Sequence, residues 1–223
     1  MKLSQLRDNI QKRIHWFESQ FNPPAIVVAS HTPSMTILDQ LQSNCPILGM
    51  FPPIQTAVSA SKTRHIAVLG TQNLVQSTAM KRLKSDLSDA EIHLVDASVL
   101  IQSMEQFQFV IDPVGTDNLL RSFFKSLCLK DPLIDVVTLS STHLSFLEPL
   151  ICRQFPKLLC LDATQALVLE LSKIVTPALS VTTSTASPLL VLVTESAEFP
   201  AHAFSKGLSL LGFDEAVEVV DID

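Results

Sequence analysis

The chain has few charged residues and no long run of either charge. Charged residues make up 17% of its 223 residues, and the formal net charge is −6. No run of lysine or arginine is long enough to form a phosphate-binding stripe, which argues against nucleic acid as a partner. An uninterrupted apolar run of the ~18 residues that a membrane span needs is also missing. We therefore expect neither nucleic-acid binding nor membrane insertion.

Secretion signals and cysteine motifs are missing too. The first residues, Met-Lys-Leu-Ser-Gln-Leu-Arg-Asp-Asn, lack the apolar core of a signal peptide. The four cysteines form no CxxC pair, and no histidine is spaced from them as in a zinc site. We expect free, mostly buried thiols in a reducing cytoplasm, and we assign no metal ligand. The cysteines are Cys45, Cys128, Cys152 and Cys160.

Apolar residues make up 47% of the chain and occur in short runs. Residues 3–21 carry apolar side chains at spacings of three and four, which predicts an amphipathic helix. Strands are then predicted at 26–29, 46–50, 65–69, 91–95, 134–139, 157–161, 189–193 and 216–220. Helices are predicted at 36–42, 74–85, 98–110, 116–127, 146–154, 163–173 and 201–211, and a loop at 181–187. This alternation is typical of parallel βα units.

Two of the predicted strands end in nearly the same polar cluster. Residues 26–32 read Ile-Val-Val-Ala-Ser-His-Thr, and residues 136–143 read Val-Val-Thr-Leu-Ser-Ser-Thr-His. Open α/β sheets bind their ligands at the carboxyl ends of parallel strands. The repeat therefore predicts two related lobes, each with its own sheet, that face one shared cleft.

At these two clusters the sequence resembles the aspartate/glutamate racemase family, and glutamate racemase in particular. Ala-Ser-His-Thr at 29–32 stands in place of the family's Ala-Cys-Asn-Thr, and Ser-Ser-Thr-His at 140–143 in place of Gly-Cys-Thr-His. Between them, His-Ile-Ala-Val-Leu-Gly-Thr at 65–71 is similar to the strand and turn that open the family's second lobe.

The resemblance implies an α/β fold of two Rossmann-like lobes with parallel sheets, related by pseudo-twofold symmetry. The first lobe would comprise residues 1–53 and 163–223, and the second residues 54–162. It also implies a homodimer, a small acidic amino acid or related carboxylate as ligand, and no cofactor. By position, the catalytic candidates are Ser30, Ser141 and His143. The substrate-binding candidates are His31, Thr32, Thr71 and Thr142.

The sequence departs from the family at the residues that carry its chemistry. Racemisation needs two matched bases, and serine occupies both thiol positions, at Ser30 and Ser141. A serine hydroxyl is a weak base unless a neighbour activates it. The family's opening strand and its Pro-Tyr-Gly segment have no counterpart, and the chain contains no tyrosine. We therefore expect an N-terminally shortened and catalytically degenerate homologue.

Two other functions remain open. One is an isomerase that uses Ser, Thr and His in place of the cysteines. The other is a lyase or hydrolase built on a Ser–His pair. Such a pair across the lobes, Ser30 with His143 or Ser141 with His31, is easier to form than one between the adjacent Ser30 and His31. The remaining histidines His65, His93 and His202 are interpreted as structural or surface residues without a partner, and Asp162 as a helix cap.

Overall fold

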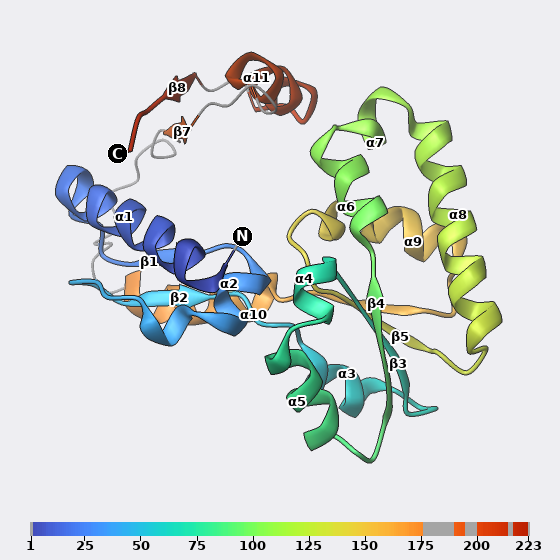
Figure 1. The fold of residues 1–223 in the computed structure, drawn as a ribbon. Helices are drawn as coiled ribbons and strands as arrows, with labels where there is room; N and C mark the ends of the chain where they lie inside the picture. The colour runs from blue at the N-terminus through green and yellow to red at the C-terminus, as the bar shows by residue number, and fades with distance from the viewer. Residues whose placement is uncertain (1, 176–189, 195–199, 214–215, 223) are drawn as a thin grey trace.

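The computed structural model describes residues 2–175, 190–194, 200–213 and 216–222, and the loop predicted at 181–187 lies outside them. The chain has an α/β fold, as predicted, and the strand pairs among these residues are all parallel. Figure 1 shows the arrangement.

The strands are β1 Ile26–Val28, β2 Ile47–Gly49, β3 His65–Gly70, β4 Glu91–Asp96, β5 Val136–Leu139, β6 Leu159–Leu161, β7 Val191–Val193 and β8 Val217–Val219. The α-helices are α1 Leu3–Phe21, α2 His31–Thr36, α3 Ile54–Ala60, α4 Gln72–Val75, α5 Thr78–Asp86, α6 Ser98–Glu105, α7 Gln108–Ile111, α8 Pro113–Lys130, α9 Glu148–Gln154, α10 Thr164–Val175 and α11 Ala201–Leu210, with 3-10 turns η1 Leu38–Gln40 and η2 Leu144–Leu147.

The strands of the described residues form three sheets rather than the two we expected. The largest has the order β4-β3-β5-β6, while β1 pairs with β2 and β7 pairs with β8. The four-stranded sheet lies within the predicted second lobe. The strands of the predicted first lobe are divided between two short sheets, because β1 and β7 are not paired with each other. The lobe boundaries themselves stay a prediction.

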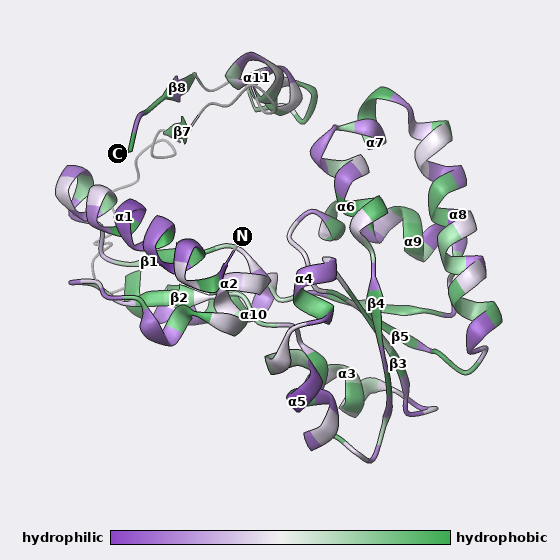
Figure 2. Cartoon of the chain, in the orientation of Figure 1, coloured by the Kyte–Doolittle hydropathy of each residue, from purple (hydrophilic) through white to green (hydrophobic). Residues whose placement is uncertain are grey.

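The four-stranded sheet has a hydrophobic core on each face. Along β3, Ala67 and Leu69 face α6, α8 and α9, and Ile66 and Val68 face α3 and α5. Side chains of a strand alternate between faces, so a run that is apolar at every position indicates a strand covered on both sides. In Figure 1, α6, α8 and α9 lie on one side of the sheet and α3 and α5 on the other, and Figure 2 shows the sheet between them as largely hydrophobic.

Helix positions differ from the predicted ones where polar residues or prolines begin a helix. The helix predicted at 36–42 begins earlier, at His31, and a proline at position 33 fits its first turn because the amide there needs no partner. The helix predicted at 74–85 is divided into α4 and α5, since Ser77 caps a new start by accepting from the Met80 amide. Helix α3 follows Pro53 and was not predicted at all.

Two further expectations concern the surface. Of the four free cysteines only Cys160 is buried, whereas Cys152 is exposed, so the prediction of mostly buried thiols is wrong. No helix among the described residues has the length and apolar character to cross a bilayer.

A carboxylate joins the start of β5 to the connection between α3 and β3. Asp135 accepts hydrogen bonds from the Ser61 hydroxyl and from the Lys62 and Thr63 amides. Burial would raise the pKa of Asp135, but these hydrogen bonds outweigh it and hold the pKa below its usual value. The ionised form of Asp135 therefore stabilises the folded state.

Replacing Asp135 by asparagine is expected to lower the free energy of unfolding at pH 7 by about 1 kcal/mol, after allowance for solvent screening. A depressed carboxyl pKa stabilises the fold above the unfolded pKa of about 4 and loses this effect as the pH falls further. The deficit of D135N should therefore shrink in acid. Urea denaturation at pH 7 and pH 3 measures it, with the exposed Asp8→Asn as control. Equal stabilities at pH 7 would contradict the role of Asp135.

Candidate functional site

A cavity of about 200 Å³ lies at the carboxyl ends of β1, β3 and β5. Its wall contains all seven residues that the sequence singled out. Residues of both polar clusters thus line one cavity, and the roles assigned to them from the sequence stay predictions. The lining residues are Ala29, Ser30, His31, Thr32, Thr71, Ile101, Glu105, Ser140, Ser141, Thr142 and His143.

The first polar cluster spans the turn from β1 into α2. Ser30 is extended and precedes the helix, and His31 and Thr32 form its first turn. The Ser34 hydroxyl donates to the Ser30 carbonyl at 2.7 Å and accepts from the Met50 amide at 2.9 Å. A buried serine thus fixes this turn against β2. His31 is thus part of helix α2 and not of the strand that precedes it.

The second cluster is fixed by the central strands of the large sheet. The Ser140 amide donates to the Leu69 carbonyl at 2.8 Å, which places the end of β5 beside the end of β3. Thr71 follows β3 and caps α4 by accepting from the Leu74 amide. Its hydroxyl also lies 3.3 Å from the Thr32 hydroxyl. This contact joins the two clusters directly.

His31 is the most unusual residue of the cavity wall. Its side chain is only 3% exposed, and neither ring nitrogen has a hydrogen-bond partner within the described part of the chain. Burial lowers the pKa of His31 to about 4, although the nearby Asp162 carboxylate acts in the opposite direction. At neutral pH the ring is therefore uncharged, and its nitrogens are covered by protein.

The Ser–His pairs considered from the sequence are not formed as expected. The hydrogen bonds of the described residues include neither the cross-lobe pairs nor a Ser30–His31 pair. Instead Ser141 Oγ lies 3.5 Å from His143 Nδ1 within one loop, at the outer limit of a hydrogen bond. Asp162 caps α10 through Thr164, as predicted.

Two lining residues were missed by the sequence analysis. Ile101 and Glu105 lie one turn apart on α6, and their spacing alone resembles that of any amphipathic helix. They also line an adjoining cavity of about 680 Å³, which extends toward α11.

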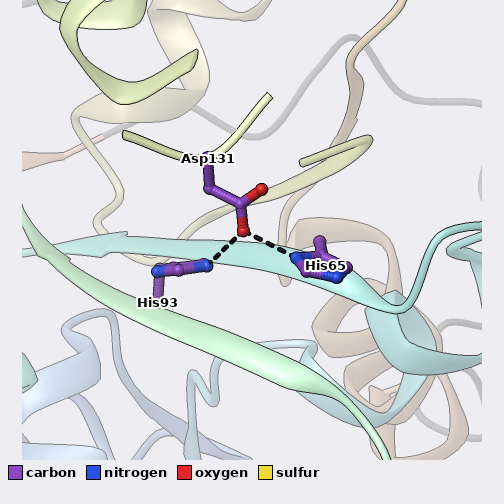
Figure 3. Close-up of side chains that lie close together, drawn as sticks. All are labelled: His65, His93 and Asp131. Carbon is purple, nitrogen blue, oxygen red and sulfur yellow. Dashed lines mark hydrogen bonds and ion pairs between the residues drawn. The ribbon is translucent and has the colours of Figure 1, made fainter. Parts of the chain in front are cut away.

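His65 and His93 do have a partner, contrary to our expectation. The ring of His65 lies 2.6 Å and that of His93 2.7 Å from the same carboxylate oxygen of Asp131. Figure 3 shows the three side chains converging from separate segments. This cluster includes the first residue of β3 and the third residue of β4, whereas the cavity lies at the carboxyl end of the sheet.

Comparison with known proteins gives the same relationship at the level of sequence and of fold. The chain is 27% identical over 206 residues to a glutamate racemase from Sulfurihydrogenibium, covering 91% of this chain and 74% of that protein. It is 25% identical over 156 residues to glutamate racemase from Persephonella marina, covering 69% and 59%. No protein-family model matches the chain.

The solved structures agree in fold over the whole chain. Glutamate racemase from Escherichia coli superposes with a TM-score of 0.82 at 17% identity, covering 100% of this chain and 84% of that one. The enzyme from Thermus thermophilus gives 0.71 at 23% identity, with 100% and 81% covered. The chain is related to the aspartate/glutamate racemase family. Its match spans less than two thirds of the Persephonella racemase.

The buried His31 of this racemase relative makes its stability depend on pH. The folded pKa lies below the ordinary value of 6.5. Protons therefore bind the unfolded chain preferentially as the pH falls from 6.5 toward 4. The uncharged form of His31 is compatible with the fold, so the free energy of unfolding is highest above pH 6.5. It falls below pH 6.5, by on the order of 2 kcal/mol between pH 7 and pH 5.

His31→Leu should remove this part of the pH dependence. At pH 7 the variant should be at least as stable as the wild type, since an unpaired buried imidazole is replaced by an apolar side chain. Urea denaturation at pH 7 and pH 5 tests this, with the exposed His202→Leu as the matched histidine control. If H31L loses as much stability between pH 7 and pH 5 as the wild type does, the assignment to His31 is contradicted.

Proposed function

We propose that this protein binds a small acidic amino acid, or a related carboxylate, in the cavity between the two polar clusters, and that it does so without two-thiol racemisation. The observation that carries the proposal is the composition of the cavity wall: hydroxyls and imidazoles from both strand ends, and no cysteine. Such a wall supplies hydrogen bonds to a polar ligand but no pair of thiols for two-thiol racemisation.

The size and polarity of the cavity suit a small zwitterion. Its volume of about 200 Å³ is below the ~300–1,000 Å³ of most drug-sized ligand sites. The lining contains no lysine or arginine, so the hydroxyls of Thr32, Ser141 and Thr142 would hold a carboxylate. Glu105 is the only carboxylate of the lining, and it offers a counter-charge to an α-ammonium group. The E. coli glutamate racemase was solved with L-glutamate, which supports this class of ligand.

The available bases argue against efficient racemisation. The reaction needs one group to remove the α-proton and a second group on the opposite face to return one. His31 has a pKa of about 4 and covered ring nitrogens, so it is a weak base that the substrate does not reach. The serine hydroxyls lack a strong activating partner, because Ser141 only approaches His143 at 3.5 Å.

The alternative function is an isomerase in which serine, threonine and histidine side chains, His31 and His143 among them, replace the cysteines. The observation in its favour is that the two imidazoles line one cavity and come from different clusters. A Ser–His hydrolase is supported less, since no carboxylate of the described residues orients His143 for a role as general base. We therefore place binding first and isomerisation second.

Ligand binding should be visible as a rise in melting temperature with L- or D-glutamate or aspartate. Thr142→Val removes a hydroxyl of the cavity wall that has no partner in the described structure, and it should weaken binding by about tenfold. The exposed Thr56→Val on α3 is the matched control and should bind as the wild type does. No shift with any of the four ligands, in a folded protein, would refute the proposed ligand class.

Chemistry is tested separately by deuterium incorporation at Cα of both enantiomers of glutamate and aspartate, in deuterated buffer and at high protein concentration. The binding proposal expects no exchange above that of free amino acid. Exchange that is retained in T56V and lost in His143→Gln would instead establish the isomerase. The two experiments are independent, because binding without exchange and exchange without a thermal shift are distinguishable results.

A further inference from the structure

We propose that His65, His93 and Asp131 form a binding site for a divalent transition-metal ion, with zinc as the representative ion. The site lies apart from the candidate cavity. His65 begins β3 and Thr71 follows its last residue, so about 20 Å of extended chain separates the two places. The proposal is therefore independent of the ligand and the chemistry assigned to the cavity.

The sheet register brings the two imidazoles to one face. His93 pairs with Ala67 across the parallel strands, and Ala67 lies two residues after His65. Residues i and i+2 of a strand point to the same face, so His65 and His93 both point toward α8. Helix α8 ends at Asp131, which is its C-cap residue. Three segments far apart in sequence thus place N, N and O donors together, as Figure 3 shows.

The distances fit a small cation after a modest adjustment. The three donor atoms all lie within 4.8 Å of one another. In a tetrahedral zinc site, bonds of about 2.0–2.1 Å place neighbouring ligand atoms about 3.3 Å apart. The two N···O contacts of 2.6 and 2.7 Å would therefore widen by less than 1 Å. Each imidazole would carry its proton on the other ring nitrogen, so the nitrogen that now donates becomes the ligand.

The surroundings favour a positive charge at this point. Asp131 stands at the C-terminus of an 18-residue helix, where the helix dipole disfavours a carboxylate and favours a cation. The other oxygen of Asp131 accepts from the Leu133 amide at 2.9 Å, which orients the carboxylate as outer-shell contacts do in metal sites. Lys84 lines the pocket beside His93 but pairs with Glu91 at 3.8 Å.

The exposure of the cluster provides access for an ion. The side chains of His65, His93 and Asp131 are 27%, 31% and 12% exposed, so the donors are neither sealed in the core nor free on the surface. Three protein ligands leave a fourth position for water, as in zinc sites that keep an open coordination position. Bound metal would link β3, β4 and the end of α8, and so stabilise the folded state.

The test is titration of the chelator-treated 223-residue chain with Zn²⁺ and Co²⁺. We expect one ion per chain, a higher melting temperature with zinc, and a cobalt visible spectrum of N/O ligation without thiolate charge transfer. His93→Gln and Asp131→Asn keep size and hydrogen-bonding capacity but lose a good ligand. Each should weaken binding by at least about tenfold. His202→Gln, an exposed histidine on α11, is the matched control and should bind as the wild type does.

Two results would overturn the site. One is the absence of saturable binding by the wild type, which would leave the cluster as a hydrogen-bonded triad only. The other is wild-type affinity in both H93Q and D131N, which would place the ion elsewhere, for example at Cys152. Circular dichroism confirms that each variant folds, and His65→Gln replaces a variant that does not.

Discussion

The pairing of β3 with β5 is the constraint on which both candidate sites depend. Ile66 to Leu69 pair in parallel with Val136 to Leu139, and every residue of this ladder is buried. A shift of one residue would turn each apolar side chain to the opposite face, so the two cores fix the register firmly. The same register sets the end of β3, which Thr71 follows, beside Ser140 at one end of the sheet. At the other end of the sheet, His65 begins β3 close to the C-terminal end of α8.

How much of the fold the sequence predicts depends on how strongly a segment is buried. The strands around 65–70 and 136–139 were predicted within one or two residues, because an apolar run covered on both faces has few alternatives. The turn into α2 was misplaced, because His-Thr-Pro-Ser has poor helix propensity and the helix is held by the tertiary contacts of Ser34. The division of β1, β2, β7 and β8 into two sheets has no signal in the local sequence, because it depends only on which strands pair with each other.

The candidate cavity was predicted from a rule about strand ends, and the rule also defines what was missed. All seven predicted residues lie on the segments that directly follow β1, β3 and β5, where open α/β sheets bind their ligands, and two of them, His31 and Thr32, belong to the first turn of α2. Glu105 is the last residue of α6, and only the packing of this helix brings it to the cavity wall. Asp131 is 66 residues from His65 and 38 from His93. No sequence motif links these three residues. The register of β3 and β4 brings the two histidines together, and the length of α8 places Asp131 beside them.

His31 decides which chemistry the cavity can support. An imidazole without partners costs about 1–3 kcal/mol in a folded protein, so its position must be held by the surrounding packing. That packing also covers both ring nitrogens and lowers the pKa of His31 to about 4. A group held in this way is neutral and a poor proton acceptor, which suits the wall of a binding site better than a pair of matched bases. The two properties have one cause, because the burial that leaves the ring unpaired is the burial that keeps it uncharged.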